Sequence, residues 1–170
     1  AWGQPQLLLR IDLERKDNMT GAITLLQTAV DKNDDNALLR KELGDLYRIS
    51  DQYEKARDAY LMALDRGLAS GALDRNLGIS YEQLEQDQLA EDRFKAALEK
   101  NPNDPYTLNY LGYWWADDGR NLDEAIKLIE QAVRLRPRSG YFVDSRGWVQ
   151  YTLGNYDLAV ALPETAPTLE

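Results

Sequence analysis

The sequence predicts an all-α protein built from repeated helix pairs, and three observations lead to this prediction. A Leu-Gly pair followed by an aromatic residue recurs every 34 residues, with its glycines at Gly44, Gly78 and Gly112. A set of small residues recurs at the same step downstream, beginning with Ala56 and Ala90. No alternation of apolar and polar residues competes as a strand pattern. The chain length of 170 residues is five times the repeat period.

The period divides the chain into five units within a single array, and each unit should hold two antiparallel helices joined by a short turn. Small Gly and Ala side chains let helix backbones approach closely, and the larger Leu, Tyr and Phe positions fill the layer between helices. The units are residues 3–36, 37–70, 71–104, 105–139 and 140–162, with a tail at 163–170.

The first two units share a polar junction. Unit one has Leu9-Arg10 in place of Leu-Gly, although Ala22 and Ala29 stay in register. The first helix of unit two should begin at about residue 37, with Asn36 capping its free N–H groups.

Proline and acidic residues mark the helix boundaries of units three and four. Asn101-Pro102 should end one helix because proline cannot continue it. Asp104-Pro105 should begin the next, since Asp can cap and Pro fits the first helical position. The following turn, residues 119–122, carries one extra residue. The acidic pairs around it, 117–118 and 123–124, are expected to be solvated turn residues and not a catalytic carboxylate pair.

The last unit is truncated. Pro163 stands where an aromatic residue belongs, so the last helix should stop near Leu162 and residues 164–170 should be extended. Residues 162–166 match the short sortase recognition sequence, but we expect a boundary remnant here because such short matches are often accidental. The incomplete unit should leave apolar surface uncovered, which predicts a weak homo-oligomer or an end-to-end contact.

The repeated motif resembles the tetratricopeptide repeat (TPR). That family carries Leu-Gly-x2-Tyr, then Ala-x3-Phe, then Pro over 34 residues, and Leu43-Gly44 with Tyr47 begins one such unit here. The resemblance covers nearly the whole chain. It implies a right-handed superhelical solenoid whose first helices line a concave groove.

Composition excludes several classes of function. Histidine and cysteine are absent, which removes His- and Cys-based catalytic triads, Cys/His zinc sites and disulfides. We therefore predict a protein that is not an enzyme and has no cofactor. The net charge of −9 argues against a nucleic-acid partner or an anionic membrane surface.

The resemblance implies a partner-binding groove along the first helix of each unit. Aromatic side chains gather at groove positions in the C-terminal half, whereas the N-terminal half is polar. Tyr and Trp provide large contact areas at protein interfaces. The alternative is that some of these rings pack between helices, as Trp114 and Trp115 should. The predicted groove residues are Lys41, Arg75, Asn76, Tyr106, Asn109, Tyr110, Tyr113, Asp144, Trp148 and Tyr151.

Two other site patterns occur in the sequence, and the repeat fits it better than either. The carboxylate clamp of chaperone-binding TPR domains does not fit, because Asp45 and two tyrosines occupy positions that need cationic or amide groups. Residues 31–42 resemble a calcium-binding loop, except that Asn36 replaces its glycine. The repeat register favours a solvated turn here, because it puts Glu42 on a helix.

The sequence thus predicts a non-enzymatic scaffold that binds a peptide or partner protein in its groove. The alternative is one part of a longer TPR assembly protein that mainly self-associates. The later units also resemble those of bacterial exported TPR proteins, which implies an adaptor in the bacterial envelope. The compartment stays open between periplasm and cytoplasm.

Overall fold

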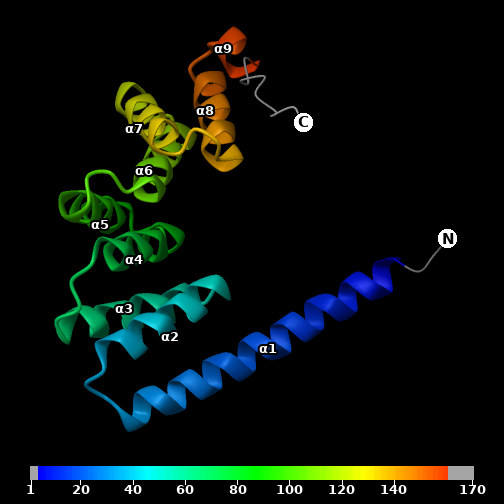
Figure 1. Ribbon diagram of the computed structural model, residues 1–170, viewed down its shortest axis with the longest axis vertical. Helices are drawn as coiled ribbons and strands as arrows, with labels where there is room; N and C mark the ends of the chain where they lie inside the picture. The colour runs from blue at the N-terminus through cyan, green and yellow to red at the C-terminus, as the bar shows by residue number, and fades with distance from the viewer. Residues whose placement is uncertain (1–3, 161–170) are drawn as a thin grey trace, which may run out of the picture. The chain divides into compact units, whose positions relative to one another are not determined.

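The computed structural model describes the backbone of residues 4–160 and the side chains of residues 18–159. Every regular element in this part is an α-helix (Figure 1), which confirms the predicted fold class. The helices are α1 (Gln4–Lys32), α2 (Ala37–Ile49), α3 (Tyr53–Asp65), α4 (Gly71–Gln83), α5 (Asp87–Lys100), α6 (Pro105–Asp117), α7 (Leu122–Leu135), α8 (Gly140–Thr152) and α9 (Tyr156–Val160). Pro163, Pro167 and the predicted tail lie outside the described residues.

Polar side chains begin the helices where the sequence predicts. Asn36 accepts a hydrogen bond from the backbone N–H of Leu39 at 3.1 Å, and this cap begins α2. Asp104 accepts one from the N–H of Thr107 at 3.1 Å, ahead of proline at the start of α6. Each cap satisfies a backbone N–H group that has no partner within its helix.

The first unit departs from the expected helix pair. Residues 3–36 were predicted to form two helices, but α1 runs unbroken from Gln4 to Lys32 (Figure 1). The difference coincides with a change at the repeat glycine. Arg10 stands where a glycine elsewhere lets two paired helices approach closely.

The chain forms two compact units, Ala1–Arg93 and Phe94–Glu170, with their boundary inside α5. We call them the N-terminal and C-terminal units. In the N-terminal unit α2 packs on α3, and the core includes Leu43, Tyr60 and Leu77. A Cβ atom at Gly44 would lie 2.6 Å from the Tyr60 ring, so the repeated glycine is required by this helix contact.

In the C-terminal unit α6 packs on α7, and α8 packs on both. A Cβ atom at Gly112 would lie 2.8 Å from the backbone carbonyl oxygen of Ala125, which explains the glycine at this position. Trp114 and Trp115 are buried, as predicted. This packing presents the remaining face of α6 and α8 to solvent.

Candidate functional site

In the N-terminal unit, the predicted polar residues of α2 and α4 meet at Asp45. One carboxylate oxygen of Asp45 accepts hydrogen bonds from Tyr60 Oη at 2.7 Å and Asn76 Nδ2 at 2.8 Å. Its other oxygen accepts from Lys41 Nζ at 2.6 Å. Lys41 and Asn76 are thus held by an internal network, and the third predicted residue, Arg75, lies half-buried on α4.

The network shifts the titration of its members. Burial alone would raise the pKa of the Asp45 carboxyl, but hydrogen bonds from Lys41, Tyr60 and Asn76 outweigh burial and hold that pKa below its ordinary value. Burial and the hydrogen bond to Asp45 both raise the pKa of Tyr60. Burial lowers the pKa of Lys41, but its hydrogen bonds to Asp45 and Glu42 leave the pKa raised overall. At neutral pH the network therefore contains a carboxylate and an ammonium group.

In the C-terminal unit, most predicted aromatic residues are exposed. Tyr113 on α6 and Trp148 on α8 stack with ring centroids 6.4 Å apart and planes 26° apart. Trp148 also stacks on Tyr151, at 5.9 Å and 24°. Tyr156 on α9 extends the row by an edge contact with Tyr151 at 5.4 Å. The exposed fractions are 39% for Tyr113, 41% for Trp148, 55% for Tyr151 and 61% for Tyr156. We call these four rings the aromatic row.

A second group of rings lies at the other end of α6 and α8. Tyr106 contacts Phe142 edge-on at 5.5 Å, and Tyr141 contacts the same ring at 5.3 Å. Phe142 is buried, whereas both tyrosines are exposed. The predicted residue set omitted Tyr141 and Tyr156, although Tyr141 holds a groove position in the repeat register.

Two of the predicted residues lie below this surface. Tyr110 is half-buried and stacks on Phe94 at 5.2 Å. Asn109 is only 1% exposed, and neither atom of its side-chain amide has a hydrogen-bond partner among the described residues. Both residues therefore contact the protein interior, while Tyr106, Tyr113, Trp148 and Tyr151 face solvent.

Asp144, the remaining predicted residue, is exposed on α8 one turn before Trp148. Across residues 18–159 its carboxylate makes no ion pair and no hydrogen bond. The same holds for Asp117, which is the single charged residue of α6 and lies one turn after Tyr113.

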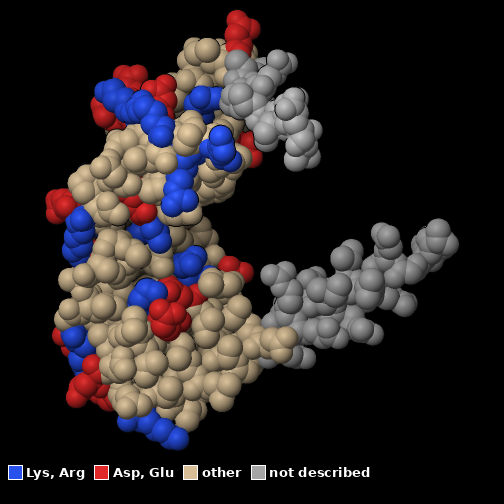
Figure 2. Space-filling view, in the orientation of Figure 1, with Lys and Arg blue, Asp and Glu red and all other residues tan. Residues whose placement is uncertain are grey.

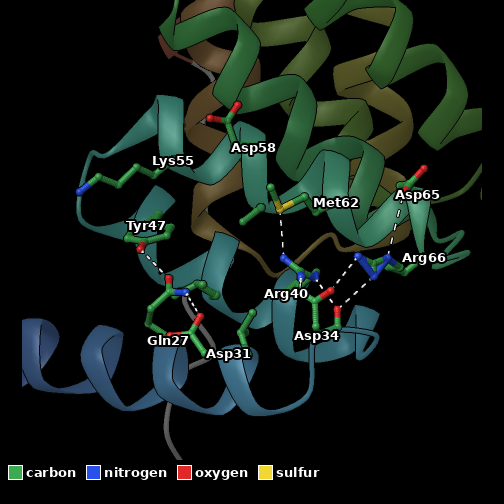
Figure 3. Close-up of a pocket in the computed structure, with 13 residues that line it drawn as sticks. Gln27, Asp31, Asp34, Arg40, Tyr47, Lys55, Asp58, Met62, Asp65 and Arg66 are labelled. Atoms are coloured by element: carbon green, nitrogen blue, oxygen red, sulfur yellow. Dashed lines mark hydrogen bonds and ion pairs between the residues drawn. The ribbon is translucent and has the colours of Figure 1, made fainter.

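The N-terminal unit contains a cavity of about 600 Å³ that is lined by charged and apolar side chains of α1, α2 and α3 (Figure 3). Arg40 lies within it, donates from Nη1 to Met62 Sδ at 3.0 Å and is paired with the carboxylate of Asp34. Arg66 also pairs with Asp34, at 3.1 Å, and with Asp35 at 2.9 Å. The charged groups of the cavity thus largely satisfy one another.

These contacts describe the turn that resembles a calcium loop. Its carboxylates at Asp34 and Asp35 bind guanidinium groups, and Asp31 accepts from Gln27 Nε2 at 2.8 Å. Glu42 lies on α2, as the repeat register predicts. Among the described residues no group of three or more acidic, His or Cys side chains is arranged to hold a metal ion.

The wider surface is mixed in charge. Basic and acidic side chains are interspersed on the face shown in Figure 2. In the part of the chain that the structure covers, none of the helices combines the length and the apolar character needed to cross a bilayer.

Comparison with known proteins places these features in context. The family model described as tetratricopeptide repeat matches residues 11–72, 52–105, 75–137 and 115–166. A TPR repeat-containing protein of Pseudomonas aeruginosa is 33% identical over 109 residues, which are 62% of this chain and 18% of that protein. The photosystem I assembly protein Ycf3 of Synechococcus is 27% identical over 122 residues, which are 64% of this chain and 67% of its own length.

Solved structures agree on the fold. The crystal structure of YrrB, described as a TPR protein with an unusual peptide-binding site, has a TM-score of 0.66 and 25% identity. The match covers 88% of this chain and 77% of that chain. MamA gives a TM-score of 0.72 at 21% identity, over 86% of this chain and 85% of its own. The likeness to MamA shows the fold alone.

Proposed function

Because this chain belongs to the tetratricopeptide repeat family, whose members are generally non-enzymatic interaction scaffolds, we propose that it binds a peptide or partner protein through the exposed face of α6 and α8. The observation that carries this proposal is the aromatic row. Its rings are large, rigid and half-exposed, and they come from three helices, α6, α8 and α9, of one compact unit. Clustered exposed aromatic residues of this kind mark interaction surfaces.

The two units carry different roles in this proposal. Lys41 and Asn76 are bound to Asp45, so they act as internal supports of α2 and α4. Tyr106, Tyr113, Trp148 and Tyr151 are accessible and supply the partner contact. Tyr110 supports α6 from beneath through its stacking on Phe94.

The relatives support a binding role in general terms. YrrB is described as having a peptide-binding site, and Ycf3 as an assembly protein. From these relatives we infer only that this chain binds another polypeptide. An adaptor role in the bacterial envelope is a finer form of the same proposal.

The proposal is tested by affinity capture from bacterial extract with the intact chain and two matched double variants. Tyr113→Ala/Trp148→Ala removes the centre of the aromatic row. Leu89→Ala/Leu135→Ala removes two exposed apolar side chains from α5 and α7 and serves as the control. We expect a partner whose yield falls about tenfold or more in the first variant and stays unchanged in the control, as interface hot spots behave.

Equal helicity of the three proteins, checked by circular dichroism, ensures that capture reports on the surface. A partner retained equally by both double variants would refute the aromatic face as the binding site.

Self-association is the second candidate function, and the exposed residues of α9 favour it. Tyr156 and Leu158 on α9 are 61% and 58% exposed. Another TPR helix could cover them, from a second copy or from an adjoining part of a longer array. Light scattering that detects only a monomer at high concentration would refute the second-copy form of this idea.

A further inference from the structure

The exposed face of α6 and α8 carries acidic charge beside its rings. On α6 the positions at helical spacing are Tyr106, Tyr110, Tyr113 and Asp117, and on α8 they are Tyr141, Asp144, Trp148 and Tyr151. The charged residues of this face are therefore two aspartates. The other charged residue of α8, Arg146, is two positions from both Asp144 and Trp148 and points to the opposite side of the helix.

Both aspartates are available to a ligand. Asp117 and Asp144 are exposed, and within residues 18–159 their carboxylates have no cationic partner. Each lies one helical turn from a ring of the aromatic row: Asp117 from Tyr113, and Asp144 from Trp148. Residues at this spacing are side-chain neighbours on a helix surface.

An arginine side chain matches this pairing of ring and carboxylate. Its planar guanidinium can stack on an aromatic face while its N–H groups bond a carboxylate at the edge. A tryptophan ring attracts a cation more strongly than the other aromatic rings do. Lysine offers the charge without the planar stacking surface.

The same unit already contains this arrangement. The guanidinium carbon of Arg120 lies 4.3 Å from the centroid of the Trp114 ring, and Arg120 Nε donates to Asp118 at 3.1 Å. Arg120 thus combines stacking on tryptophan with an ion pair to aspartate at a partly exposed turn after α6. Trp148 and Asp144 present the ring and the carboxylate of such a triad on the surface.

We propose that the face of α6 and α8 binds an extended, arginine-bearing segment of a partner protein, with one guanidinium packed against the exposed part of the Trp148 ring and ion-paired to Asp144. A second basic residue of the segment would reach Tyr113 and Asp117. This inference rests on the proposed function, because it names the chemistry of the partner for the same surface.

The test uses a fluorescein-labelled peptide that repeats Gly-Arg-Ser four times, with binding followed by fluorescence anisotropy at about 0.15 M salt, where distant surface charges are largely screened. A second peptide replaces each arginine with citrulline, which keeps the shape and removes the charge. We expect saturable binding of the arginine peptide and binding at least about tenfold weaker for the citrulline peptide.

Variants then locate the site. Asp144→Asn should weaken binding of the arginine peptide by about threefold to tenfold, and Trp148→Leu by a similar factor. Trp148→Phe, which keeps a ring, should restore part of the loss. Asp123→Asn is the matched control: it changes the net charge equally at an exposed position of α7 and should stay within about twofold of the original affinity.

Three results would overturn the inference: no binding of the arginine peptide, equal binding of the citrulline peptide, or equal weakening by Asp123→Asn and Asp144→Asn. The last would indicate diffuse attraction to an acidic protein. A captured partner that depends on Tyr113 and Trp148, together with any of these results, would leave the proposed function standing. Loss of that dependence would refute the proposed function itself.

Discussion

Asp45 joins three side chains from three helices, and this connection makes it the polar residue of the N-terminal unit whose replacement we expect to be most destabilising. Asp45→Asn removes the charge that pairs with Lys41 and leaves an amide opposite the amide of Asn76. We expect a loss of about 1–2 kcal/mol in the free energy of unfolding at neutral pH, measured by urea titration. Asp58→Asn, at an exposed surface ion pair with Arg57, should cost less than about 0.5 kcal/mol.

In the unsubstituted protein, acidic pH should remove the stabilisation that the Asp45 carboxylate provides. Because the folded pKa of Asp45 lies below the ordinary value of 3.8, its stabilisation is complete above that value and is lost as pH falls through the lower folded pKa. The stability difference between the original protein and Asp45→Asn should therefore narrow below about pH 4. A difference that stays constant across this range would contradict the assignment.

Asp45 and Asn109 also show that side-chain hydrogen-bond partners could not be predicted from the sequence. Both hold positions that the repeat register assigns to the groove, yet Asn109 is buried and Asp45 is half-buried. Whether such a buried polar side chain forms hydrogen bonds depends on donors and acceptors that lie elsewhere in the chain. Two of the three donors to Asp45 are 15 and 31 residues away, at Tyr60 and Asn76. Asn109 meets no such donor or acceptor among the described residues.

At the scale of helices and turns, the repeat period extends to backbone conformation. The turn after α2, α4, α6 and α8 contains a residue with positive φ, at Asp51, Glu85, Gly119 and Gly154. These positions are separated by almost the same interval as the Leu-Gly motif. Glycine occupies two of them, whereas Asp and Glu occupy the other two in a conformation that most L-residues adopt rarely.

This pattern predicts opposite effects of two substitutions. Glu85→Gly should relieve the left-handed backbone, at φ 58°, and raise stability by up to about 1 kcal/mol. Gly119→Ala, at φ 66° with open space around its Cβ, should lower stability by about 1 kcal/mol through backbone strain alone. Chemical denaturation measures both, and a destabilising Glu85→Gly would show that the glutamate side chain supports its turn.

Helix contacts make a second prediction at this scale. Gly112→Ala places a methyl group 2.8 Å from the Ala125 carbonyl oxygen, and because that atom belongs to the backbone, α6 and α7 must move apart. We expect a loss of at least about 2 kcal/mol, as for an overpacked core. Gly21→Ala, in α1 with nothing within 4 Å, should instead raise stability by about 0.5–1 kcal/mol. Equal effects of the two changes in denaturation experiments would contradict this packing argument.

The helix boundaries were predictable where the capping residues, the prolines and the repeat register indicated the same position. The caps at Asn36 and Asp104 and the stop at Pro102 predicted boundaries that the structure confirms. The first unit differed because its signals conflicted: the downstream alanines kept the repeat register, while the close-approach glycine was missing. Without that glycine the register alone did not require a turn, and α1 continues through it.

At the scale of the whole molecule, the proposed binding function and the acidic composition both favour a basic partner. A net charge of −9 attracts basic segments and speeds their encounter, while the rings of α6 and α8 can hold them at short range. The acidic composition is consistent with the basic partner segment that we propose. The stacking of Tyr113 on Trp148 requires two helices to lie side by side, which only the structure supplies.

The division into two compact units leads to a prediction about cooperativity. In repeat proteins, stability is close to a sum of local terms and nearest-neighbour terms, so damage in one unit need not spread evenly. Gly112→Ala disturbs α6 and α7 of the C-terminal unit, whereas Gly44→Ala forces a methyl group against Tyr60 in the N-terminal unit. Hydrogen exchange followed by mass spectrometry should therefore show the largest loss of protection in the unit that carries the substitution.

The two variants act as controls for each other, because each introduces the same methyl group at the same position of the repeat. Reciprocal profiles would mean that either unit can open while the other stays folded, and that the aromatic face of α6 and α8 opens separately from the Asp45 network. If both variants lost protection equally along the whole chain, the protein would unfold as one cooperative body. In that case, stabilising Asp45 and its partners would also stabilise the binding surface.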